Sequence, residues 1–164
     1  MASEGDLLAS AAARGDLELA KEMLEKGAEP NGTNSQGRTP IQVMMMGSPK
    51  MAELLLKHGA NPRVPDPLTG TCPAHDAARE GFLDTLLILY QGGASLQEPC
   101  DRYGMRPIDL APDWMKDKLK QNYILLMFSC QSGCVELPNE REAFRTGNLH
   151  GMFGIIGHAF HPMP

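Results

Sequence analysis

The sequence lacks most features by which a function is usually recognised. Aromatic residues make up only 5% of its 164 residues, with a single tryptophan, which disfavours an aromatic-rich core. Basic residues are not in excess, and the formal net charge of −5 argues against nucleic acid or an anionic membrane as partner and favours a basic protein surface. No apolar run is long enough to span a bilayer, and the first six residues lack the basic segment and apolar core of a secretory signal.

Chemistry-bearing motifs are also missing. The chain has no glycine-rich phosphate loop, no metal-ligand constellation, and no Ser or Cys nucleophile beside an evident base. We therefore expect no enzyme activity, no cofactor and no bound metal. The cysteine spacing matches no common zinc pattern, and in a chain without a secretory signal we expect free thiols at Cys72, Cys100, Cys130 and Cys134.

What the sequence does contain is a repeat of about 33 residues, shown by two independent markers. Gly-Ala pairs are separated by 32 and then 34 residues, at Gly27-Ala28, Gly59-Ala60 and Gly93-Ala94. Helix-opening proline pairs are separated by 33 and 34 residues, at Thr39-Pro40, Cys72-Pro73 and Arg106-Pro107. The pattern predicts an all-α solenoid of four helix–turn–helix repeats with β-turn loops, at 5–33, 34–66, 67–99 and 100–128.

Helix boundaries follow from the local residue types. In the first repeat we expect helices at 7–13 and 17–25, separated by Arg14-Gly15. In the fourth repeat Pro112 interrupts the first helix, and an apolar residue every four positions predicts a new, atypical closing helix over 114–128. The tail, 129–164, shows no repeat marker, and we expect it to be disordered.

The first helix of the second repeat is one residue shorter than that of the third. From Pro40 to Gly47 is seven residues, whereas the matching stretch from Pro73 to Gly81 is eight. Losing one residue rotates everything beyond it by about 100°. We therefore predict a short or 3₁₀-like turn over 42–46, with its methionines projecting differently from their counterparts elsewhere.

The stretch 75–84 carries the most informative charges. Asp76, Arg79, Glu80 and Asp84 cluster around the tight turn at Gly81 between two predicted helices. A solvated helix face would explain any one of them, but together they favour a binding surface, because repeat stacks bind partners on one concave side. The segment Pro73-Ala74-His75-Asp76-Ala77 is also a close variant of the ankyrin signature.

Over roughly 5–111 the chain resembles the ankyrin-repeat inhibitors of the cyclin D-dependent kinases. The resemblance is carried by residues 8–15, 41–48 and 75–86, and it includes the shortened helix of the second repeat. From Pro112 onward the sequence departs from that family. The resemblance implies a monomer in the cytoplasm and nucleus that binds monomeric cyclin-dependent kinases 4 and 6 beside the ATP cleft. Such inhibitors twist the kinase lobes, oppose cyclin D and restrain progression through G1.

The resemblance also implies a set of kinase contacts. Apart from one arginine, they are carboxylates and methionines of the first three repeats: Glu18, Met44, Met45, Asp66, Asp76, Arg79 and Asp84. Arg79, together with Glu80, is expected to hold Asp76 in place. Simpler explanations stay open: Glu18 as a solvated helix residue, the methionines as core, and Asp66 as a turn residue bonded to its own backbone. His75 we expect to hydrogen-bond between repeats. The alternative to kinase inhibition is that the chain is a generic ankyrin scaffold that binds a different protein partner.

Overall fold

The computed structural model describes residues 3–129 of the chain, and the side-chain surroundings of residues 3–121. The chain divides into two compact units, Met1–Asn122 and Tyr123–Pro164, and the candidate site lies in the first. The regular elements of the described residues are all helices, as predicted: α1 (Glu4–Arg14), α2 (Leu17–Glu25), α3 (Pro40–Val43), α4 (Pro49–Lys57), α5 (Pro73–Glu80), α6 (Leu83–Gln91), α7 (Pro107–Leu110) and α8 (Asp113–Ser129).

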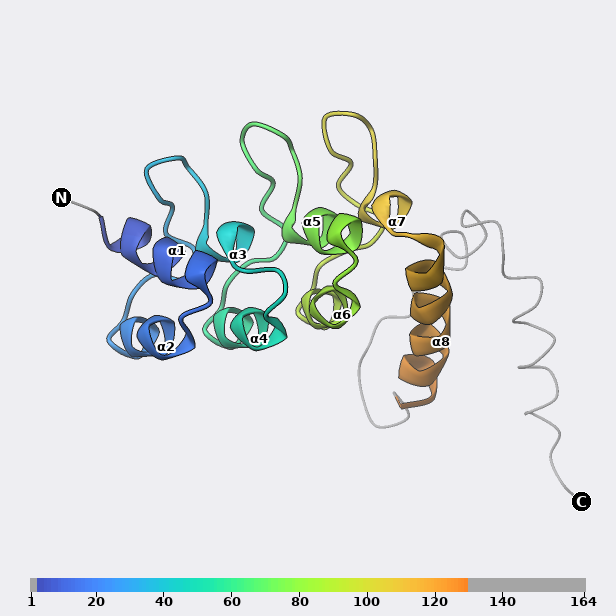
Figure 1. Ribbon diagram of the computed structural model, residues 1–164, viewed down its shortest axis with the longest axis horizontal. Coiled ribbons are helices and arrows are strands. Elements are labelled where there is room, and N and C mark those ends of the chain that lie inside the picture. The colour runs from blue at the N-terminus through green and yellow to red at the C-terminus, as the bar shows by residue number, and fades with distance from the viewer. Residues whose placement is uncertain (1–2, 130–164) are drawn as a thin grey trace, which may run out of the picture. The chain divides into compact units, whose positions relative to one another are not determined.

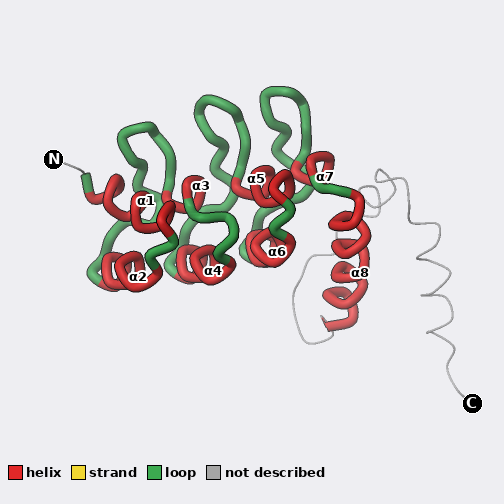
Figure 2. Tube along the Cα trace, in the orientation of Figure 1, coloured by secondary structure: helices red, strands yellow, loops and turns green. Residues whose placement is uncertain are grey.

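The helices of the first unit stack in two rows. Figure 1 shows α1, α3, α5 and α7 in one row and α2, α4 and α6 in a second, in agreement with the packing of α1 on α3, α5 on α7, and α4 on both α2 and α6. Long loops leave the second row and return to the first, and all three project from the same side (Figure 2). This is the helix–turn–helix solenoid that the repeat predicted.

Capping residues explain where the helices begin and end. Ser3 and Asp6 form a reciprocal capping box, so α1 begins at Glu4, three residues before the predicted start at Leu7. Proline occupies the first turn of α3, α4, α5 and α7, where its missing N–H costs no hydrogen bond. Gly81 ends α5 in the left-handed region, at a φ of 83°.

The core of the first unit is aliphatic and rich in alanine. Small side chains let neighbouring helices approach closely, and Ala11, Ala12, Ala52, Ala77 and Ala78 are fully buried. Larger side chains fill the space between the rows, among them Leu8, Ile41, Met51, Leu55, Leu86, Leu89, Met115 and Leu119. Phe82, at the N-cap position of α6, is 39% exposed rather than buried in this core.

The first helix of the second repeat is short, as predicted, but it is not 3₁₀. Residues 40–43 form a single α-helical turn, and the chain becomes extended at Met44, with φ −56° and ψ 156°. In the fourth repeat α7 also has four residues, and α8 begins directly after Pro112, one residue before the predicted start. The predicted disordered tail lies outside the described residues except for Ser129, the last residue of α8.

Candidate functional site

Asp76 and Arg79 form the charged centre of the predicted surface. Both lie on α5, and Arg79 Nη1 is 3.1 Å from Asp76 Oδ1. The Asp76 side chain is one-third exposed, and burial raises its pKa more than Arg79 and His75 lower it. A partly desolvated carboxylate with one exposed cationic partner can gain from a second cation. The contact between Arg79 and Asp76 agrees with the expectation that Arg79 holds this carboxylate in place. Glu80 is exposed on the helix surface.

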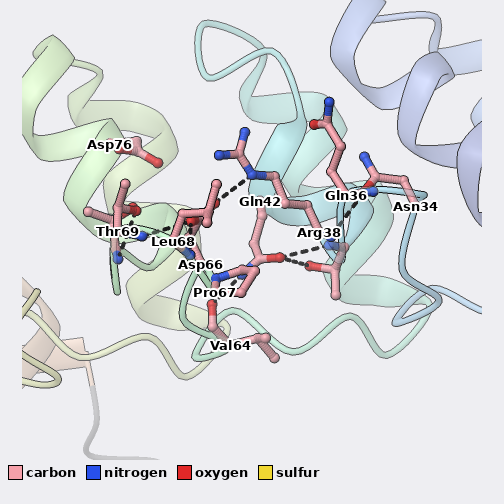
Figure 3. A network of polar contacts seen from close by, with 12 residues as sticks. Asn34, Gln36, Arg38, Gln42, Val64, Asp66, Pro67, Leu68, Thr69 and Asp76 are labelled. Carbon is pink, nitrogen blue, oxygen red and sulfur yellow. Dashed lines mark hydrogen bonds and ion pairs between the residues drawn. The ribbon is translucent and has the colours of Figure 1, made fainter. Parts of the chain in front are cut away.

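Asp66 organises the loop before α5. Its Oδ1 accepts hydrogen bonds from the backbone N–H groups of Leu68 and Thr69, at 2.8 and 2.9 Å. Figure 3 shows this carboxylate inside the loop, with Arg38 reaching it from the preceding repeat and Asp76 on the helix nearby. Asp66 is only 8% exposed, so the turn-forming explanation describes its geometry, and any contact with a partner would be made by the loop that it holds.

An ion pair joins Asp66 to the preceding loop. Arg38 Nε lies 2.6 Å from Asp66 Oδ2, so the two side chains form an ion pair. The attraction is between their charges, because Arg38 Nε makes no hydrogen bond. Burial raises the pKa of Asp66, but the backbone hydrogen bonds from Thr69 and Leu68 and the charge of Arg38 outweigh it, so the pKa lies below its usual value. No sequence pattern singled out Arg38. The recurrence of Asn34, Asp66 and Asp101 at the heads of successive loops marks the loops but not this ion pair.

The two predicted methionines differ. Met45 is 46% exposed, whereas Met44 is 3% exposed and belongs to the core. For Met44 the burial agrees with the alternative that this methionine belongs to the core. The extended backbone at Met44 turns consecutive side chains to opposite sides, as in a strand, so one enters the core and the next leaves it. Of the two predicted contacts, Met45 is the one whose side chain is exposed to a partner.

The remaining predicted contacts lie at the starts of second-row helices. Glu18 is in the first turn of α2 and Asp84 in the first turn of α6, and both are exposed. An acidic residue there is favoured by the positive end of the helix dipole, so stability alone would explain either of them. The structure thus leaves both carboxylates available without assigning them a partner.

His75 has the structural role that we expected. It is fully buried, its Nδ1 accepts a hydrogen bond from Cys72 N–H at 2.9 Å, and its Nε2 lies 3.1 Å from the carbonyl oxygen of Met105. Because Nδ1 accepts, Nε2 carries the proton and donates to Met105 in the next repeat. The imidazole therefore fixes α5 against the following loop.

The described residues include no cluster of three or more histidine, cysteine, aspartate or glutamate side chains that could hold a metal ion. In the same part of the chain, none of the helices is both long and apolar enough to cross a membrane. What the site offers is a shaped surface with carboxylates, one arginine and one exposed thioether. Such a surface can bind another protein, and its described groups suggest recognition rather than bond chemistry.

The chain is similar in sequence to a known class of repeat proteins. Residues 8–100 match the family of ankyrin repeats present in three copies, so the chain is an ankyrin-repeat protein. It is 59% identical over 106 residues to the cyclin-dependent kinase 4 inhibitor B of Rattus norvegicus, covering 65% of this chain and 81% of that one.

Two human relatives give the same result. Identity is 58% over 113 residues to the cyclin-dependent kinase inhibitor 2A of Homo sapiens, covering 69% of this chain and 72% of the relative. It is 59% over 106 residues to the human cyclin-dependent kinase 4 inhibitor B, covering 65% and 76%. The chain belongs to the family of ankyrin-repeat inhibitors of cyclin-dependent kinases, which are binding proteins rather than enzymes.

Proposed function

We propose that this chain is a protein inhibitor of cyclin-dependent kinases 4 and 6. Its similarity to proteins named as inhibitors of cyclin-dependent kinase 4, over most of their length, is the observation that carries the proposal. We propose further that it acts as a monomer, in the cytoplasm and nucleus, and binds the cyclin-free kinase beside the ATP cleft. It would thereby oppose activation by cyclin D and restrain progression through G1.

Inhibition of this kind requires only differential binding. A ligand shifts a conformational equilibrium when it binds one state more tightly than the other, so a rigid stack that fits a twisted kinase holds the lobes in that arrangement. Rigidity comes from the buried aliphatic core and from inter-repeat bonds such as those of His75 and Asp66. Specificity would come from the Asp76–Arg79 pair, which presents a carboxylate to a basic groove on the kinase.

The direct test is affinity measured by calorimetry against purified cyclin-free kinases 4 and 6 and against a mitotic cyclin-dependent kinase. We expect binding to kinases 4 and 6 at submicromolar concentration and none to the mitotic enzyme. A folded chain that leaves both kinases unbound at micromolar concentration would overturn the proposal, and would favour an ankyrin scaffold with a different partner.

The charge of Asp76 should matter most at the interface. Asp76→Asn keeps the shape of the side chain but removes the charge, and truncating one side of a buried charge pair costs about 2–5 kcal/mol. We therefore expect affinity for kinase 4 to fall at least tenfold, since about 1.4 kcal/mol corresponds to tenfold. Glu25→Gln is the matched control, because Glu25 lies in an exposed ion pair on α2. Equal affinities of the two variants, with unchanged circular dichroism, would rule out this role for Asp76.

A further inference from the structure

Three exposed apolar side chains recur near the junctions between the two helices of successive repeats. They are Met45, Phe82 and Trp114, which are 46%, 39% and 53% exposed. Each belongs to a successive repeat, at the point where the chain passes into α4, α6 or α8. We call these three residues the apolar ladder.

Each side chain of the ladder packs against a glycine of the preceding repeat. A Cβ built on Gly15 would lie 3.1 Å from Met45 Sδ, and one on Gly47 would lie 3.4 Å from Phe82 Cε1. A Cβ on Gly81 would likewise lie 3.4 Å from Trp114 Cζ2. The same contact is therefore repeated three times, and it places the three side chains at equivalent positions along the stack.

Trp114 reaches this position by a route of its own. The family match ends at residue 100, and Pro112 separates α7 from α8. Within α8, Met115 and Leu119 are buried and fix the inward face of the helix. Trp114 precedes Met115 by one residue, about 100° around the helix, and is therefore directed away from that face. The divergent segment thus continues the ladder with the largest side chain available.

Carboxylates occur near the ladder, two of them in ion pairs with Arg79 and Lys116. Asp84 lies two residues after Phe82 and is exposed, Asp76 lies on α5, and Asp113 directly precedes Trp114 with its side chain fully exposed. An apolar strip flanked by carboxylates is complementary to an apolar surface flanked by basic groups. The ladder includes Met45, a predicted kinase contact, and Phe82 lies two residues before Asp84, another predicted contact. It therefore adjoins the proposed kinase-binding surface.

We propose that Trp114 is a further kinase-contacting residue, which extends the interface of this chain from the third repeat onto α8. The inference rests on the proposed function, because the partner is the same cyclin-free kinase. Tryptophan is enriched among the few residues that carry most of the energy of an interface, since it buries a large rigid surface. The atypical fourth repeat then supplies a contact of its own besides closing the stack.

The single tryptophan makes the proposal directly measurable. The full chain labelled with 5-fluorotryptophan gives one ¹⁹F resonance, which reports on position 114 alone. On addition of unlabelled cyclin-free kinase 4 we expect the resonance to move, and the shift between light and heavy water to fall as the ring leaves solvent. Titration of the labelled chain alone tests whether a second copy covers the ring, and a concentration-dependent loss of that solvent shift would overturn the proposal.

Variants separate this inference from the proposed function. Trp114→Ala should weaken kinase 4 binding at least tenfold, whereas Trp114→Phe should retain affinity within about threefold because an aromatic ring still covers Gly81. If the wild-type chain binds but its fluorine resonance and solvent shift do not change, the role of Trp114 is refuted and the proposed function stands. If the wild-type chain does not bind kinase 4 or 6, both are refuted.

Discussion

The second and third repeats use the same design with helices of different length. In the third repeat α5 has eight residues and ends at a left-handed glycine, whereas in the second α3 has four and is followed by extended chain. The short repeat replaces the missing helical hydrogen bonds with bonds to its neighbours. Met45 N–H donates to Ala12 O in the first repeat, and Met46 O accepts from Thr85 in the third. In the short repeat, hydrogen bonds to neighbouring repeats stabilise the segment that would otherwise be helical. Met45 lies at the surface.

The largest effect on stability should come from the bond that holds the short repeat to the third. Thr85 is 1% exposed, and its Oγ1 donates to Met46 O at 2.7 Å. Thr85→Val keeps the shape but leaves that carbonyl without its donor, which should cost about 2 kcal/mol. Thr85→Ser, the control, keeps the hydroxyl and should lose about 0.8 kcal/mol for the missing methyl group. Urea unfolding measures both, and a valine variant as stable as the serine one would contradict this account.

Two glycines distinguish backbone strain from crowding. A Cβ at Gly81 or Gly47 would meet an aromatic ring of the next repeat at 3.4 Å, but only Gly81, with a φ of 83°, lies in the left-handed region. Gly81→Ala should therefore lose about 1–2 kcal/mol, the cost of that conformation for a residue with a Cβ.

Gly47→Ala, in contrast, should change stability by no more than about 0.5 kcal/mol. Thermal melting of the two variants makes the comparison. An equal loss would show that crowding by the ring, rather than φ, sets the requirement for glycine at the two turns.

The smallest effect concerns the ion pair between the loops of these two repeats. The folded-state pKa of Asp66 lies below its usual value of 3.8, so its stabilising contribution is complete above that pH and is lost as the pH falls through the folded value. Asp66→Asn removes the pair with Arg38 and should cost about 1 kcal/mol at neutral pH. The difference between the two urea midpoints should narrow as the pH falls below 3.8 and close below the folded-state pKa of Asp66. A difference that stays constant over that range would show that the charge of Asp66 does not contribute.

Much of this fold could be predicted from the sequence, because each repeat carries its own local signals. The Thr39-Pro40, Cys72-Pro73 and Arg106-Pro107 pairs predicted where α3, α5 and α7 begin, and the missing residue before Gly47 predicted that α3 is short. The early start of α1 was missed, because it depends on a side-chain capping box rather than on apolar spacing.

The site was less predictable, because it depends on how repeats meet. Spacing indicated that the methionines project differently, but only the extended backbone at Met44 decides which of them is buried. The Arg38–Asp66 pair joins loops about one period apart, and no local pattern indicates it. Trp114 lies beyond the residues that match the ankyrin-repeat family, and its contact with Gly81 follows from the path of α8 after Pro112.

Amide hydrogen exchange of the full chain, alone and saturated with cyclin-free kinase 4, tests the central claim most directly. The claim is that the first-row turns and the Asp76 helix form the binding surface. We predict slower exchange over residues 44–46 and 76–84 in the complex, with the last turns of α2 and α4 unchanged. Unchanged exchange in both segments while kinase 4 is bound, or protection confined to the second-row helices, would contradict it.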